Sequence, residues 1–80
     1  IYPNPFNPET TIRYTLTAPG EVEMTVYDIR GRTVRTLFNK FQETGEHSII
    51  FHASDLPSGV YVCRLQSGNT RTARKMLLLK

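Results

Sequence analysis

Two segments in which apolar and polar residues alternate restrict most strongly how this chain can fold. They span residues 11–17 and 21–29, and no segment of the chain shows helical periodicity. An alternating pattern places successive side chains on opposite faces of an extended strand, so one face of each segment is predicted to be buried. The apolar positions are Ile12, Tyr14, Leu16, Val22, Met24 and Val26. The chain is therefore predicted to consist of strands.

A tight corner precedes the most apolar strand, residues 60–65. Pro57 restricts one backbone angle of the corner, Gly59 supplies a flexible one, and Tyr61 follows near the start of the strand. In Greek-key sandwiches a tyrosine at this position hydrogen-bonds to the backbone of the preceding corner. The alternative is an ordinary turn with a half-buried tyrosine. We predict the hydrogen bond, because a buried hydroxyl needs a partner.

Glycine and proline mark the other turns. Pro19 and Gly20 suit the two central positions of a type II turn, and Asp28 and Gly31 suit the first and last positions of a type I turn. Residues 67–69 suit a tight hairpin turn. Residues 39–44 are predicted to form a polar loop in which the ring of Phe41 packs against the end of the fold. The strands predicted between these turns are residues 11–17, 21–29, 32–38, 46–53, 60–65 and 70–80.

The N-terminal segment, residues 2–8, contains Pro3, Pro5 and Pro8. Each proline removes a backbone donor, so the segment suits an extended edge strand with Tyr2 or Phe6 in the core. The spacing of Pro5 and Pro8 also fits a ligand of aromatic grooves, but this pattern is short and common. With the edge strand included, short strands recur at intervals of about 8–12 residues. This spacing predicts an all-β fold, a seven-stranded immunoglobulin-like antiparallel β-sandwich formed as one domain by residues 1–80.

Composition excludes several classes of function. The chain has 80 residues, a net charge of +3 and one cysteine, Cys63. The positive charge is too small and too dispersed for a nucleic-acid surface. No run approaches the roughly 18 apolar residues of a transmembrane helix. Cys63 lies within an apolar strand, where a free thiol behaves as a small buried hydrophobe.

No set of residues indicates catalysis or metal binding. His47 and His52 lie an odd number of positions apart on one strand, so they are predicted to face opposite sides of a sheet. Neither a cysteine nor a carboxylate cluster completes a metal site. Glu21 and Glu23 share one face of their strand, which is predicted to face solvent. We therefore expect no catalytic, metal or cofactor-binding residues, and a protein that is not an enzyme.

The last strand differs from the others, because it becomes apolar on both faces. The run of Met76, Leu77, Leu78 and Leu79 follows a basic pair, Arg74 and Lys75, and precedes Lys80. A strand with two apolar faces is usually covered on both sides. The sequence therefore predicts that a neighbouring domain or a partner covers the outer face of this strand.

Taken together, the motifs of the chain resemble those of the C-terminal sorting domain of the type IX secretion system. They are Tyr2-Pro3-Asn4-Pro5-Phe6-Asn7-Pro8, Thr11-Ile12-Arg13-Tyr14, Val26-Tyr27-Asp28 with Gly31-Arg32, Gly45-x-His47, and Leu56-x-Ser58-Gly59-Val60-Tyr61. The resemblance covers nearly the whole chain. It implies an immunoglobulin-like domain at the C-terminus of an exported protein. The residues that it identifies as the structural motif are Pro3, Asn4, Pro5, Gly31, Gly59 and Tyr61.

The resemblance also implies partners and a location. The outer-membrane machinery of type IX secretion would recognise the domain, a sortase-like peptidase would remove it, and the N-terminal cargo would be secreted or attached to the cell surface. The residues expected to be recognised are Arg74, Lys75, Met76, Leu77, Leu78, Leu79 and Lys80. The family often has adjacent lysines near its end, whereas this chain has Arg74 and Lys75. Because the chain opens without an initiator methionine, we expect it to be part of a larger secreted protein.

Two alternatives come from different classes of protein. The motif Gly45-x-His47 and the corner at residues 58–61 also resemble the immunoglobulin-like domain of flagellar hook-capping proteins, which would make this chain a structural assembly module. An accessory binding module of a secreted hydrolase is the other alternative. Carbohydrate-binding surfaces usually carry a row of exposed aromatic side chains, and this chain has no tryptophan.

Overall fold

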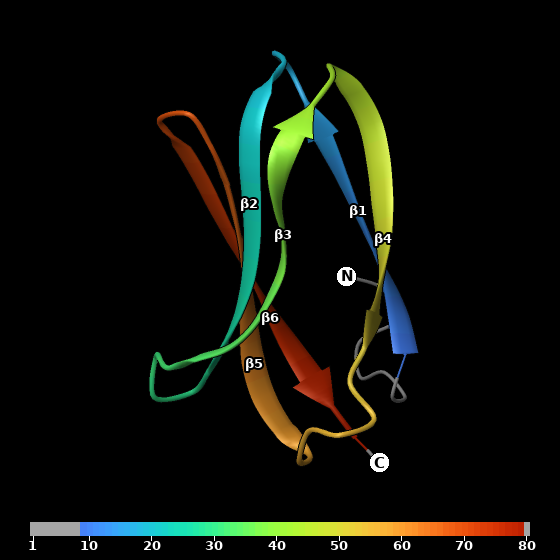
Figure 1. Cartoon of the computed structure of the whole chain (residues 1–80). Helices are drawn as coiled ribbons and strands as arrows, with labels where there is room; N and C mark the ends of the chain where they lie inside the picture. Colours follow the sequence, from blue (N-terminus) through green and yellow to red (C-terminus); the bar gives the residue numbers. More distant parts are fainter. Residues whose placement is uncertain (1–8, 80) are drawn as a thin grey trace.

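Six antiparallel strands in two sheets form the part of the chain that the computed structural model describes, residues 9–79 (Figure 1). The strands are β1 (Glu9–Leu16), β2 (Gly20–Asp28), β3 (Thr33–Gln42), β4 (Gly45–His52), β5 (Gly59–Ser67) and β6 (Thr70–Leu78). The predicted all-β fold with antiparallel pairing is confirmed. The seventh strand was predicted at residues 2–8, which lie outside the described residues together with the motif Pro3, Asn4 and Pro5.

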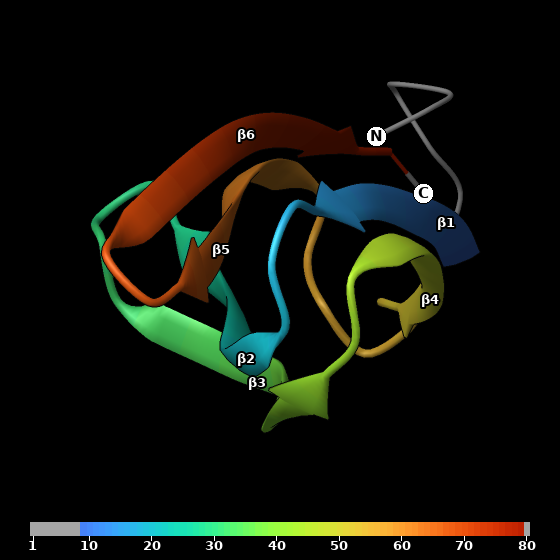
Figure 2. The same ribbon diagram turned by 90° about the horizontal axis from the view of Figure 1, so that it is seen from above.

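The two sheets contain strands that are far apart in the sequence. The smaller sheet pairs β1 with β4, and the larger sheet has the strand order β3-β2-β5-β6. Viewed from above, the two sheets lie on opposite sides of the molecule (Figure 2). The chain therefore crosses between the sheets after β1, after β3 and after β4, so these connections hold the two layers together.

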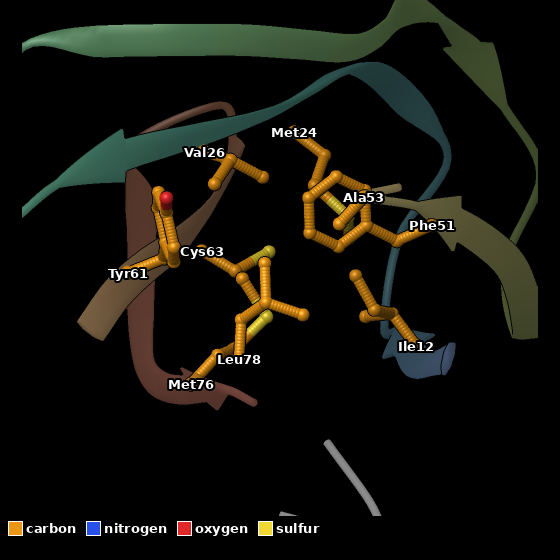
Figure 3. Packing of buried hydrophobic residues seen from close by; sticks show 9 residues of the cluster. All are labelled: Ile12, Met24, Val26, Phe51, Ala53, Tyr61, Cys63, Met76 and Leu78. Carbon is orange, nitrogen blue, oxygen red and sulfur yellow. The ribbon is translucent and has the colours of Figure 1, made fainter. Parts of the chain in front are cut away.

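The core lies between the sheets and takes side chains from both (Figure 3). Ile12 of β1 and Phe51 of β4 meet Met24 of β2 and Met76 of β6, and each of these is at most 5% exposed. The core cluster consists of Ile12, Met24, Val26, Phe51, Ala53, Tyr61, Cys63, Met76 and Leu78. The predicted inward faces of residues 11–17 and 21–29 are confirmed, with Tyr14 half-buried at the margin.

Thr25 lies on the same face of its strand as Glu23, which is predicted to face solvent, but Thr25 is buried. Its cross-strand partner is Arg64. The Arg64 guanidinium lies 4.9 Å from the centre of the Tyr27 ring and 3.8 Å from a carboxylate oxygen of Glu23. Arg64 thus reaches the residues on both sides of Thr25 and covers it, which the alternation alone could not indicate.

Two of the predicted connections are also wrong. Gly20 is not among the glycines with a positive φ angle, which a type II turn would require at this position. It is the first residue of β2, at a crossing between sheets that needs no hairpin.

Phe41 does not pack against the end of the fold. Strand β3 continues to Gln42, Phe41 pairs with Glu21, and its side chain is 55% exposed.

The predicted turn between β2 and β3 is confirmed. The N–H of Gly31 donates to the carbonyl of Asp28 at 3.0 Å, and the φ angle of Gly31 is +84°. The Asp28 carboxylate accepts from the backbone N–H groups of Arg30 and Arg32 at 2.9 and 3.0 Å, and from Nε of Arg32 at 3.0 Å. The N–H of Arg32 is the main reason that the pKa of Asp28 is lowered.

The corner before β5 contains the predicted tyrosine hydrogen bond. The hydroxyl of Tyr61 donates to the carbonyl of Pro57 at 2.6 Å. The same loop is held by Arg35 of β3, a strand of the larger sheet, which donates to the two carboxylate oxygens of Asp55 at 2.7 and 2.6 Å. Arg35 also donates to the carbonyl of His52, at the end of β4. The loop between β4 and β5 is thus tied to both layers.

Replacing Tyr61 by phenylalanine is expected to lower the stability of the fold. The change keeps the ring and leaves the Pro57 carbonyl without its donor, at a cost of about 1–3 kcal/mol. For a domain of this size, the melting temperature should fall by about 4–20 °C. Tyr14→Phe is the matched control, since the partner of Tyr14 is the side chain of Gln42, which can turn toward water. Equal melting temperatures for wild type and Tyr61→Phe would contradict the structural role of this bond.

Glycine substitutions test the backbone of the turns. Gly31 and Gly59 have φ angles of +84° and +156°, so Gly31→Val and Gly59→Val should each cost about 1–3 kcal/mol. Gly68 has a φ angle of +59°, which asparagine tolerates, so Gly68→Asn should leave the denaturant midpoint nearly unchanged. Similar losses of stability in the three variants would mean that the backbone φ angle does not determine which residues these positions tolerate.

Candidate functional site

Strand β6 divides the predicted recognition residues between the core and the surface. Met76 and Leu78 point inward and are fully buried. Leu77, between them, is half-buried, and Leu79, just after the strand, is 48% exposed. Arg74 and Lys75 are exposed, and Lys80 lies outside the described residues. The expectation of an apolar outer face is thus met in part, because only Leu77 and Leu79 are left to form it.

The outer face of β6 continues across β5 to β2. In the register of the sheet, Leu77 pairs with Val60 and Lys75 pairs with Val62. Val62 pairs in turn with Tyr27. The side chains of Val60, Val62 and Tyr27 are half-buried. Ile29, in the following turn, is 77% exposed. We call this surface the outer patch, and it consists of Tyr27, Ile29, Val60, Val62, Lys75 and Leu77.

The outer patch contains a shallow hollow with a volume of about 370 Å³. Tyr27, Ile29 and Val62 line its apolar part, and Asp28, Gly31, Arg64 and Ala73 line the rest. The Arg64 guanidinium lies over the Tyr27 ring, an arrangement that stabilises a cation on an aromatic face. The patch therefore combines apolar surface with the positive charge of the exposed Lys75. At its margin the charges are mixed, because Arg64 lies near Glu23 and Asp28 also lines the hollow. The apolar part and Lys75 suit a partner that carries apolar and acidic groups.

The two histidines face opposite sides of β4, as the sequence predicted, because burial alternates along the strand, with His47 partly buried and His52 exposed. His47 lies 2.7 Å from the carbonyl of Glu43, and its ring stacks on Tyr14 with 5.3 Å between ring centres. His52 is exposed and lies 3.1 Å from a carboxylate oxygen of Glu9. Among residues 9–79, no group of three histidine, cysteine or acidic side chains is arranged to hold a metal ion. Each histidine has a structural partner that explains its position.

Cys63 is a free thiol in the core, where the sequence placed it. It lies on β5 between the buried side chains of both sheets (Figure 3). Burial disfavours the thiolate and raises the pKa of Cys63 to about 11. A thiol with so high a pKa is a poor nucleophile near neutral pH, so Cys63 fills space in the core.

Sequence reasoning missed the part of the outer patch that lies on β5 and β2. A signal was present, because residues 60–63 are apolar at four successive positions, as residues 76–79 are. Only the second run was interpreted as a strand with two apolar faces. Pairing Val60 with Leu77 requires the strand register, which the sequence does not contain.

A comparison with known families identifies one match. Residues 1–79 match the family model described as the secretion system C-terminal sorting domain. No curated protein and no solved structure matches the chain. Within residues 9–79, no helix is long and apolar enough to span a membrane.

The raised pKa of Cys63 predicts a pH dependence of stability. Between the ordinary thiol pKa of 9.0 and about 11, the thiol ionises in the unfolded chain but not in the folded chain. The free energy of unfolding should therefore fall as the pH rises through this window. Between about pH 8 and about pH 10, the wild type should lose about 1 kcal/mol more than Cys63→Val, which has no thiol to titrate. Urea unfolding at several pH values measures this difference, and parallel curves for the two proteins would contradict it.

Proposed function

The chain belongs to the family of secretion system C-terminal sorting domains, and we propose that the type IX secretion machinery recognises the outward face of β6 within it. The domain is a C-terminal sorting signal of type IX secretion. The cargo that it accompanies is secreted or attached to the cell surface by way of the outer membrane. The family match spans residues 1–79 and so includes all six described strands.

The placement of side chains on β6 supports this recognition surface. Lys75 and Leu77 belong to the outer patch, and Leu79 follows it, whereas Met76 and Leu78 are in the core. A receptor that buries the apolar part of the patch and offers carboxylates to the basic residues would gain both affinity and selectivity. The buried members Met76 and Leu78 then act indirectly, because they hold the outward members in register.

We also propose that the complete domain is a seven-stranded immunoglobulin-like sandwich. The pairing of β1 with β4, the order β3-β2-β5-β6 and the tyrosine corner at Tyr61 support a seven-stranded immunoglobulin-like sandwich. The additional strand of that description is predicted at residues 2–8, outside the described residues. The similarity to hook-capping domains stays a prediction.

The roles of the partners follow from the sorting function. The domain associates with the type IX machinery and with an N-terminal cargo. In our proposal a sortase-like peptidase removes the domain after export, and residues 1–80 form one unit of a larger secreted protein. We infer that this unit has no catalytic activity of its own. The two sheets enclose a hydrophobic core. His47 has a local partner in the carbonyl of Glu43, and His52 has one in the carboxylate of Glu9. These contacts support a structural role for both histidines.

Charge reversal separates recognition from folding. Lys75→Glu together with Lys80→Glu should cost the fold less than about 1 kcal/mol, because surface substitutions are usually mild. The domain is fused to the C-terminus of a periplasmic reporter, in a host that carries the type IX machinery. We expect the wild-type fusion outside the cell, and the charge-reversed fusion retained in the periplasm with an unchanged melting temperature.

A matched control carries the same charge change elsewhere. Lys40→Glu with Arg30→Glu reverses two exposed basic residues that are not on β6, and this fusion should be exported like the wild type. Equal export of the wild-type and Lys75→Glu, Lys80→Glu fusions would exclude these lysines from the signal. Equal retention of both double variants would indicate that net charge, and not the face of β6, is recognised.

A further inference from the structure

We propose that a groove between the edges of β1 and β6 binds an extended protein segment in which apolar and acidic side chains alternate. This inference goes beyond the sorting role, because it concerns a different surface from the outer patch. The ligand would pair with a sheet edge through its main chain. Three features of the groove support this ligand: its two edges, its floor and its charge.

The groove lies between two edge strands. Among residues 9–79, β1 pairs with β4 alone and β6 pairs with β5 alone, and both edges lie on the same side of the molecule (Figure 2). A cleft of about 520 Å³ separates them, with residues 12–15 on one wall and Thr72 and Arg74 on the other. A smaller cleft of about 150 Å³ continues it, since Thr15 and Thr72 line both. The groove is therefore long enough to follow several residues of each strand.

The edge of β6 offers backbone hydrogen bonds toward this groove. Ser67 and Thr70 flank a two-residue hairpin turn and pair with each other. In an antiparallel ladder, pairing alternates along the strand, so the N–H and C=O groups of Arg71 and Ala73 point away from β5. An exposed edge of this kind is a template for another strand, which binds by main-chain hydrogen bonds.

The floor of the groove is apolar. Met24 and Cys63 form its deepest part, and the half-buried side chains of Tyr14 and Leu65 form its more accessible part. A strand that pairs with β6 would place every second side chain over this floor. The ligand is therefore expected to carry apolar residues at alternate positions.

The charge of the groove walls indicates which side chains the ligand carries between its apolar residues. Arg13 and Arg74 line the groove, both are exposed, and neither makes an ion pair with a residue in the range 9–79. Carboxylates on the ligand would supply the missing partners. A second copy of β6 fits poorly, because its first half, residues 70–74, is basic and lacks alternating apolar residues. Residues 2–8 of the chain, which are predicted to form an edge strand, contain three prolines and no acidic side chain, so they lack the chemistry that the groove favours. We therefore assign the groove to a different protein segment.

Peptide binding to the 80-residue chain tests the proposal. The probe is a capped synthetic peptide of alternating valine and glutamate, and the control peptide has lysine in place of glutamate. At low salt, we expect the glutamate peptide to bind at least about tenfold more tightly than the lysine peptide, as measured by calorimetry. It should also slow hydrogen exchange at the amides of Arg71 and Ala73, because these donors would then be paired.

Two variants locate the binding. Ala73→Pro removes an edge donor without removing a bond to β5 and should weaken binding at least about tenfold, whereas Ala73→Ser keeps the donor and the affinity. Arg74→Glu should abolish the preference between the two peptides, because its negative charge offsets that of Arg13, and it remains informative if Ala73→Pro fails to fold. Equal binding of both peptides, or protection confined to other strands, would overturn the proposal. Self-association that Ala73→Pro abolishes, without peptide binding, would assign the edge to a second copy instead.

Discussion

The fold depends on how one short loop is tied to two separate sheets. The connection between β4 and β5 leaves the smaller sheet and enters the larger one. Tyr61 fixes its end through the carbonyl of Pro57, and Arg35 fixes its beginning through Asp55 and the carbonyl of His52. A chain of 80 residues without a disulfide has a small core and a narrow margin of stability. These few directed bonds, which hold Phe51 of one sheet against Met24 of the other, therefore matter more here than in a larger domain.

Strand β6 combines two roles through its alternation. Its inward residues, Met76 and Leu78, complete the core, and its outward residues, Lys75 and Leu77, belong to the outer patch. A change on the inner face must therefore disturb the outer one, because the register of the strand sets both. Variants on the two faces of β6 are therefore expected to differ, because those on the inner face act on folding as well as on the outer surface.

The sequence predicted local features better than long-range ones. The alternation around Ile12 and Met24 identified the core faces, and the spacing of Pro57 and Tyr61 identified the corner, because both depend on neighbouring residues. The burial of Thr25 depends on Arg64, far away in the sequence. The outer patch also depends on residues far apart in the sequence, since Val60 and Leu77 become neighbours only when β5 and β6 are aligned. Nothing in a single segment of sequence contains that alignment.

The basic residues of β6 also address the hazard of an exposed edge. An edge strand invites pairing with other chains, and positive charge along it opposes pairing with an identical strand. Arg71 and Arg74 lie on that edge, within a stretch that offers few apolar side chains to another copy. The same charges that exclude a second β6 leave the edge available to a partner of opposite charge. Specificity of this kind arises from repulsion of the wrong partner as much as from attraction of the right one.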